Sequence, residues 1–254
     1  LYIPGMSRTF LVIRLGSLGD VILTSAPILN LRLSYPDSRI LYLTRERFRP
    51  VVEMFGTVDE IITVSERPGL GELSNLVLSL DDRKLDCILD LHGNLRSWMI
   101  RRLTVALDKQ SYPKRRRERR SLVRTHVIPA SWPDTVDLYN QAIVAVGGGA
   151  TARRPVLSVS ADSPGGIQET SERTVVIAPG AAHDNKQWPI ERFAQVAAKV
   201  HEELGAQIVW VVTGGDDAKI DLGTYLDRGT FTSLIDRPIA EIAQAIERAE
   251  LTIA

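Results

Sequence analysis

FLVIRLGSLGDVILTSAPILNLRL, residues 10–33, is the stretch that decides the fold. It opens with the apolar run Phe10–Leu15, which predicts a strand buried on both faces. A loop with two glycines then delivers Asp20, and from Val21 onward apolar residues recur at helical spacing. Pro27 falls in the early turns of this predicted helix, where a missing N–H costs least, although its ring can kink the helix. A strand, a glycine turn and a helix N-terminus together place backbone N–H groups and a partial positive charge at the carboxyl edge of a sheet.

Length and composition narrow the class of protein. A chain of 254 residues fits one large domain or two modest ones. The 31 basic residues balance the 31 acidic ones, so no overall field favours nucleic acid as a partner. The single cysteine, Cys87, lies in an apolar run, which excludes a disulfide framework and a cysteine metal site.

The apolar runs and the two ends of the chain give expectations about the cellular location of the protein and about the completeness of the sequence. No apolar run reaches the roughly 18–20 residues that span a bilayer, and no signal peptide is visible, so we expect a cytoplasmic protein. The chain begins with Leu1, and Met6 is a candidate start. It ends at Ala254 within a predicted strand, residues 251–254, and we therefore expect it to be a fragment.

Strands and helices alternate through the first half of the chain. Strands are predicted at residues 39–44, 60–64 and 86–91, and helices at 48–55, 69–80 and 95–107. This alternation is typical of βαβ units in a parallel, doubly wound sheet, whose ligands bind at the carboxyl edge. Asp20 and the turn His92–Asn94, which follows the strand at 86–91, would share that edge.

A basic run interrupts the alternation at residues 109–133. It contains KRRRERRSLVRTH, residues 114–126, which is either a solvated loop or an anion site for a phosphorylated substrate or a membrane surface. Nucleic acid is disfavoured because no aromatic platform is interleaved. A helix capped by Asp134 and a short strand at 156–159 follow. We predict domains at residues 6–160 and 173–254, joined by a linker at 161–172.

The second half restarts the pattern. Strands are predicted at residues 173–178 and 207–213, with a small-residue loop at 179–186 and a helix at 189–204 between them. Two Rossmann-like halves facing each other across a cleft are the simplest architecture for this repeat.

Each candidate residue has a structural and a chemical interpretation. Asp20 is either a helix cap or a general base at a strand end. Lys186 is either a solvated loop residue or a phosphate ligand beside a helix N-terminus. Asp216 or Asp217 either caps the next helix or contacts a ribose. The histidines are isolated, so no metal site is predicted, and neither dinucleotide nor Walker glycine motifs occur.

Three motifs resemble those of the bacterial heptosyltransferases of lipopolysaccharide core synthesis, glycosyltransferase family 9. They are RLGSLGDVILTSAPIL at 14–29, DLHGNLRS at 90–97 and APGAAHDNKQWPIERFAQV at 178–196, in the family's order and separation. The resemblance implies an α/β fold of the GT-B type, with the second Rossmann-like domain incomplete. It also implies metal-independent, inverting transfer of heptose from ADP-heptose to a lipid A-linked core acceptor, at the cytoplasmic face of the inner membrane and without a cofactor.

The resemblance also implies roles for individual residues. Asp20 would be the base that deprotonates the acceptor hydroxyl, and Lys186 would stabilise the diphosphate leaving group. The implied donor-binding residues are Lys186, Gly180, Ala181, Ala182, Asp217 and Arg237. The implied acceptor-binding residues are Ser17, Gly19, His92, Arg96, Arg116 and Arg120.

One departure from the family and three rival functions stay open. Members continue with an Asp-Ser/Thr-Gly-x-x-His turn that binds donor phosphates, about one residue beyond Ala254, so we expect the 254-residue chain to be inactive. The rivals are a non-catalytic nucleotide-sugar-binding protein, a GT-B enzyme that uses another nucleotide sugar, and a membrane-surface adaptor acting through the arginine run.

Overall fold

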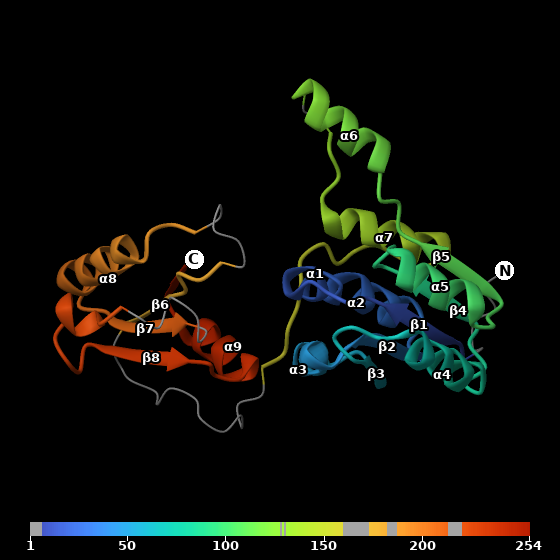
Figure 1. Ribbon diagram of the computed structural model, residues 1–254, viewed down its shortest axis with the longest axis horizontal. Coiled ribbons are helices and arrows are strands. Elements are labelled where there is room, and N and C mark those ends of the chain that lie inside the picture. The colour runs from blue at the N-terminus through green and yellow to red at the C-terminus, as the bar shows by residue number, and fades with distance from the viewer. Residues whose placement is uncertain (1–6, 128, 130, 160–172, 182–186, 213–219) are drawn as a thin grey trace. The chain divides into compact units, whose positions relative to one another are not determined.

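The computed structural model describes residues 7–127, 129, 131–159, 173–181, 187–212 and 220–254. The chain divides into two compact units, residues 1–158 and 159–254, which are called the first and the second unit below (Figure 1).

The first unit is built on a five-stranded parallel sheet of order β3-β2-β1-β4-β5. Its strands are β1 (Thr9–Ile13), β2 (Arg39–Arg45), β3 (Glu60–Val64), β4 (Cys87–Asp90) and β5 (Asp108–Ser111). β1 is central and pairs with both β2 and β4, so that Phe10 stands opposite Ile40 on one side and Cys87 on the other. The prediction that this strand is buried on both faces is confirmed, because Phe10 to Ile13 are fully buried.

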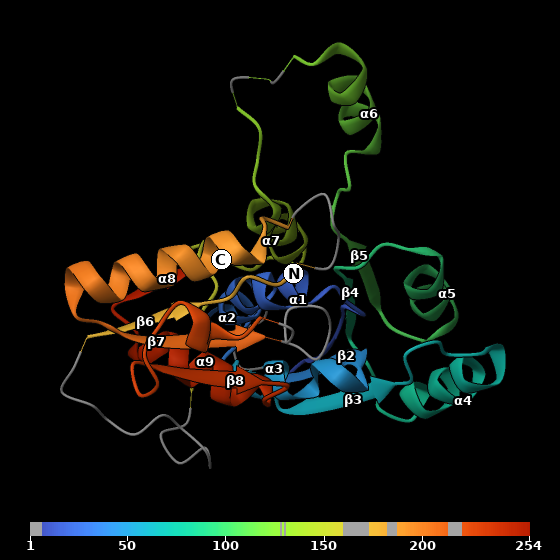
Figure 2. The same cartoon turned by 60° about the vertical axis from the view of Figure 1, so that its left-hand side comes forward.

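Helices cover both faces of this sheet (Figure 2). The helices of this unit are α1 (Leu18–Leu23), α2 (Ser25–Ser34), α3 (Arg49–Glu53), α4 (Leu70–Asp81), α5 (Leu95–Leu103), α6 (Arg116–Thr125) and α7 (Thr135–Ala145), with a 3-10 turn at Glu46–Phe48, and of these α6 stands away from the sheet. Leucines of α4 and Ile100 of α5 pack with Leu11, Ile13 and Ile88 in one core cluster. α2 packs against α7 through buried Asn30, whose side-chain amide donates to Asn140 Oδ1 at 2.9 Å.

Three local predictions for this unit are wrong. The helix after β1 is two helices that meet at Thr24, because Pro27 has no N–H for the carbonyl of Leu23 and its ring crowds that carbonyl. The helix predicted at 95–107 ends at Leu103, and Asp108–Ser111, where the basic run was predicted to interrupt the alternation, form the polar edge strand β5 without an apolar pattern. Residues 156–159 form no strand: the Ser158 N–H donates to the Met54 carbonyl instead.

The second unit has a four-stranded parallel sheet of order β8-β7-β6-β9. Its elements are β6 (Thr174–Ile177), α8 (Ile190–Leu204), β7 (Gln207–Val212), a 3-10 turn (Leu222–Thr224), β8 (Phe231–Ile235), α9 (Ile239–Arg248) and β9 (Leu251–Ile253). α8 covers one face and α9 the other, with separate core clusters. The predicted strands at 173–178, 207–213 and 251–254 and the helix at 189–204 are confirmed. β8 and α9 were not predicted.

None of the helices in the described part of the chain combines the length and the hydrophobicity that crossing a bilayer requires.

Candidate active site in the first unit

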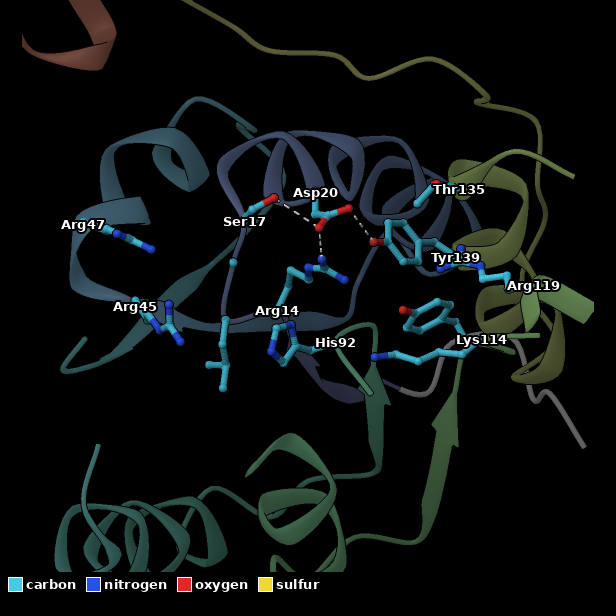
Figure 3. Close-up of a pocket in the computed structure, with 13 residues that line it drawn as sticks. Arg14, Ser17, Asp20, Arg45, Arg47, His92, Lys114, Arg119, Thr135 and Tyr139 are labelled. Atoms are coloured by element: carbon cyan, nitrogen blue, oxygen red, sulfur yellow. Dashed lines mark hydrogen bonds and ion pairs between the residues drawn. The ribbon is translucent and has the colours of Figure 1, made fainter. Parts of the chain in front are cut away.

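An arginine and an aspartate meet where β1 runs into α1 (Figure 3). Arg14 follows the last residue of β1 and is 5% exposed, and its Nη1 donates to the Leu91 carbonyl at 2.7 Å. Its Nη2 forms an ion pair with Oδ2 of Asp20, to which the Ser17 hydroxyl also donates at 3.2 Å. Ser17 occupies the N-cap position of α1 and Asp20 lies within the first turn. The carboxylate is thus held by side chains of the sheet edge rather than by capping the helix.

Two tyrosines form a wall beside this pair. The Tyr139 hydroxyl, from α7, donates to the other carboxylate oxygen of Asp20, Oδ1, over a long 3.5 Å. The Arg14 guanidinium lies 5.5 Å from the centre of the Tyr139 ring, and Tyr112 meets that ring edge-on at 4.9 Å between centroids. Burial raises the pKa of the Tyr139 hydroxyl, so it keeps its proton at neutral pH and acts as a donor.

The turn after β4 brings His92 to the same edge. Buried Asp90 organises the turn by accepting from the N–H groups of His92 at 3.0 Å and Gly93 at 2.7 Å. Asn94 caps α5 and its amide donates to His92 Nε2 at 2.7 Å, which leaves the ring proton on Nδ1. Burial, and then the charges of Arg14, Lys114 and Arg45, lower the pKa of His92 to about 4. The imidazole is therefore neutral at pH 7.

These side chains line a cavity of about 540 Å³ (Figure 3). The lining comprises Arg14, Leu15, Gly16, Ser17, Asp20, Arg45, Arg47, His92, Tyr112, Lys114, Arg119, Thr135 and Tyr139. Asp20 is the only carboxylate among these lining residues, against five cationic side chains. Arg47 and, more loosely, Arg45 also pair with Glu66, at 3.1 and 3.9 Å. The cavity therefore suits an anionic ligand and offers it one base.

The family model for glycosyltransferase family 9 (heptosyltransferase) matches residues 74–250, well over half of the chain. This protein belongs to that family. A search of curated protein sequences found no match.

Solved structures agree on the fold. The family 9 glycosyltransferase of Veillonella parvula is 22% identical with a TM-score of 0.76, over 97% of this chain and 76% of that one. E. coli heptosyltransferase WaaC with ADP is 14% identical with a TM-score of 0.75, over 96% and 80%. E. coli ADP-heptose lipopolysaccharide heptosyltransferase II is 19% identical with a TM-score of 0.75, over 97% and 78%. The predicted family and the predicted α/β, GT-B fold class are confirmed.

The acceptor residues that the family resemblance implied are not all at the cavity. Ser17 and His92 line it, whereas exposed Gly19 does not. Arg96 is exposed on α5, and Arg120 is exposed on α6. Arg116 lies next to the site, since its Nη2 donates to the Gly93 carbonyl at 3.1 Å.

Sequence reasoning missed most of the lining. Arg14 carried a usable signal, because a cation at the end of a buried strand must be paired. Tyr112, Thr135 and Tyr139 carried none, because they reach the site from elements about a hundred residues further along the chain.

The family 9 donor residues implied for the second unit are only partly described. Gly180 and Ala181 follow β6, and the Gln187 side chain donates to the Ala181 carbonyl at 3.0 Å. Arg237 follows β8 and lies 3.7 Å from Glu241. Ala182, Lys186 and Asp217, with the alternative Asp216, lie outside the described residues. In the described ranges no group of three or more His, Cys, Asp or Glu side chains could hold a metal.

Proposed function

We propose that this family 9 protein transfers a heptose from ADP-heptose to an anionic, lipid A-linked core sugar, with Asp20 as the general base. The observation that carries the proposal is the position of Asp20, the one carboxylate in the wall of a cavity otherwise lined by cations and neutral groups. Family membership supports glycosyl transfer. The ADP bound by WaaC and the ADP-heptose named for heptosyltransferase II support the donor.

The two carboxylate oxygens of Asp20 have different surroundings. Oδ2 is held by Arg14 and by the Ser17 hydroxyl. Oδ1 has only the long contact with Tyr139, so it is the oxygen free to meet an acceptor hydroxyl. In the transfer, the acceptor O–H bond breaks and its proton goes to Oδ1. The acceptor oxygen bonds to the anomeric carbon, and the bond from that carbon to the diphosphate breaks, which releases ADP and inverts the configuration.

The cations of the cavity explain how the acceptor hydroxyl reaches Asp20. Arg45 and Arg47 stand on one side of the aspartate and Lys114 and Arg119 on the other (Figure 3). Carboxylate or phosphate groups of a core sugar bound at these two positions orient the hydroxyl between them. Burial, followed by the neighbouring arginines, lowers the pKa of Lys114, and a bound anion opposes that effect.

The donor is assigned to the second unit. Lys186 and the backbone of residues 180–182 are proposed to hold the diphosphate near the N-terminus of α8, and Asp217 and Arg237 to contact the nucleoside. A lysine and a helix N-terminus supply positive charge where the leaving group develops negative charge. The peripheral location at the cytoplasmic membrane face stays a prediction of the family resemblance.

The test is made in the full-length protein and compares Asp20→Asn with wild type, with Asp82→Asn as the control at an exposed position. We expect ADP release from ADP-heptose in the presence of a lipid A-linked acceptor to fall about a hundredfold or more in Asp20→Asn only. Equal turnover in Asp20→Asn refutes the base assignment. Nucleotide binding is measured in parallel: preference for UDP or GDP over ADP rejects the donor, and ADP binding without turnover in wild type favours the non-catalytic alternative.

A further inference from the structure

Exposed apolar side chains concentrate on α5 and the segment that follows it. Leu95 is 72% exposed, Trp98 49%, Leu103 59%, Val105 68% and Leu107 89%. Within α5, the side chains of Leu95 and Trp98 lie on the face opposite the buried Ser97 and Ile100, and that of Leu103 lies at its edge. This face covers no part of the described core and also carries exposed Arg96 and Arg102.

A cationic helix begins next to this apolar face. α6 has no buried residue, and it stands away from the sheet of the first unit in both views (Figures 1 and 2). Its N-terminal end rests on the turn that starts α5, through the bond from Arg116 to the Gly93 carbonyl. Arg117, Arg120 and Arg124 recur every three to four residues along an adjacent side of the helix, and no acid in the described ranges pairs with them.

We propose that the outer face of α5, the segment 104–107 that follows it, and the arginine face of α6 together form a docking surface for an anionic lipid bilayer. The proposal rests on the proposed function, whose acceptor is lipid-linked, and it adds which side of the molecule meets the lipid. Tryptophan and leucine with flanking arginines are the composition of a surface that lies in a bilayer interface without crossing it. The arginines of α6 complement the negative charge of the lipid headgroups.

Two features favour lipid over other occupants. A two-fold contact between copies of this chain places the same face against itself and so brings the positive charges of Arg96 and Arg102 from both copies into one interface. The apolar side chains protrude separately from a helix and an extended segment, and Leu107 is almost fully exposed, which suits insertion among acyl chains. The surface also adjoins the site, because α5 begins three residues after His92 of the cavity lining.

The test is sedimentation with phosphatidylcholine vesicles, with and without phosphatidylglycerol, in the absence of donor and acceptor. We expect wild type to bind the anionic vesicles, and both Trp98→Ser/Leu107→Ser and Arg117→Gln/Arg124→Gln to weaken binding about tenfold or more. The matched control is Leu33→Ser/Val144→Ser, which replaces two exposed apolar side chains on α2 and α7 and should leave binding unchanged. Bromine-labelled acyl chains should quench fluorescence in wild type, with the quenching reduced in Trp98→Phe.

The outcomes separate this inference from the proposed function. Asp20→Asn should bind vesicles as wild type does, and Trp98→Ser/Leu107→Ser should keep its ADP release with a water-soluble acceptor fragment. Three outcomes overturn the inference, whatever the turnover. They are equal binding to neutral and anionic vesicles, binding that survives the α5 substitutions, and binding of nucleic acid or acidic protein without binding of vesicles. Loss of turnover in Asp20→Asn with no vesicle binding in wild type supports the proposed function and rejects the docking surface.

Discussion

Replacing Arg14 with methionine keeps an unbranched apolar stem in the buried position and removes the charge that holds Asp20. The structure sets the size of the effect on stability. The bond to the Leu91 carbonyl is lost, at about 1.5–3 kcal/mol for a hydrogen bond from a charged group. The ion pair contributes less than about 1 kcal/mol, because the Asp20 side chain is 37% exposed and screened by water. Burying a guanidinium is itself unfavourable, and removing this cost offsets part of the loss of the hydrogen bond and the ion pair. We expect a net loss of about 1–2 kcal/mol in the free energy of unfolding.

The effect on catalysis is expected to be larger. Without Arg14, the Asp20 carboxylate can rotate away from the cavity, and a misplacement of about 1 Å can reduce kcat about a hundredfold. Lysine at position 14 keeps the charge but cannot serve Leu91 and Asp20 together as a guanidinium does, so Arg14→Lys should recover only part of the loss. ADP release over a range of acceptor concentrations separates kcat from KM, and urea unfolding gives the stability.

Arg32→Met is the matched control. Arg32 also bonds through both terminal nitrogens, to the Ser38 carbonyl at 2.6 Å and Asp59 at 2.5 Å, but it does not line the cavity. It should lose stability and retain kcat. Wild-type kcat in Arg14→Met, or an equal loss of kcat in Arg32→Met, would refute the positioning role.

Three further predictions concern buried or partly buried side chains on and after β4. The pKa of His92 is about 4 in the folded protein and 6.5 when the side chain is free, so between these two pH values the unfolded chain takes up a proton that the folded chain does not. The free energy of unfolding therefore falls as the pH drops through that window, by about 1 kcal/mol at pH 5 after allowance for partial exposure. Urea unfolding of His92→Gln should show a weaker dependence on pH. Burial raises the pKa of Cys87 to about 12, and iodoacetamide should therefore label it only in denaturant; rapid native labelling contradicts this. The Asp90 carboxylate accepts hydrogen bonds from two N–H groups of the turn, and Asp90→Asn replaces one of its oxygens by a donor. We expect this substitution to lower the free energy of unfolding by about 2–3 kcal/mol and therefore to lower the urea midpoint. An unchanged midpoint argues against the role of Asp90 in the turn.

The sheets were predictable where a strand is buried on both faces. β1, β2, β4, β6 and β7 are short apolar runs followed by small or polar residues, and that pattern is sufficient to place a central parallel strand. β5 lies at the edge of its sheet, and its four residues are half-buried and polar, so no pattern distinguished it from a loop. Pro27 signalled a disturbed helix, but only the folded chain showed that the helix divides at Thr24.

The site was predictable where a residue follows shortly after a recognisable strand, as Asp20 does after β1 and His92 after β4. Asp20 could be placed at the sheet edge because a strand and a glycine loop precede it directly. Tyr139 reaches the same carboxylate from 119 residues away, and its contact depends on how α7 packs on the sheet. No pattern in a single sequence encodes that packing. The tyrosines beside Asp20, which favour a role at a binding site over a role as a helix cap, could therefore not be predicted.

The arginine run shows how folding divides one sequence feature between two surfaces. As a sequence it is a single block of charge, for which a solvated loop and an anion site were equal alternatives. In the helix successive residues turn by about 100°. Arg116 and Arg119, three residues apart, therefore share the side that faces the turn and the cavity. Arg117, Arg120 and Arg124 share another side and stay exposed. A charge substitution on the first side should change acceptor binding, whereas one on the second should change attachment to lipid, so the two partners considered for the anion site, a phosphorylated substrate and a membrane surface, are assigned to different residues of the same helix.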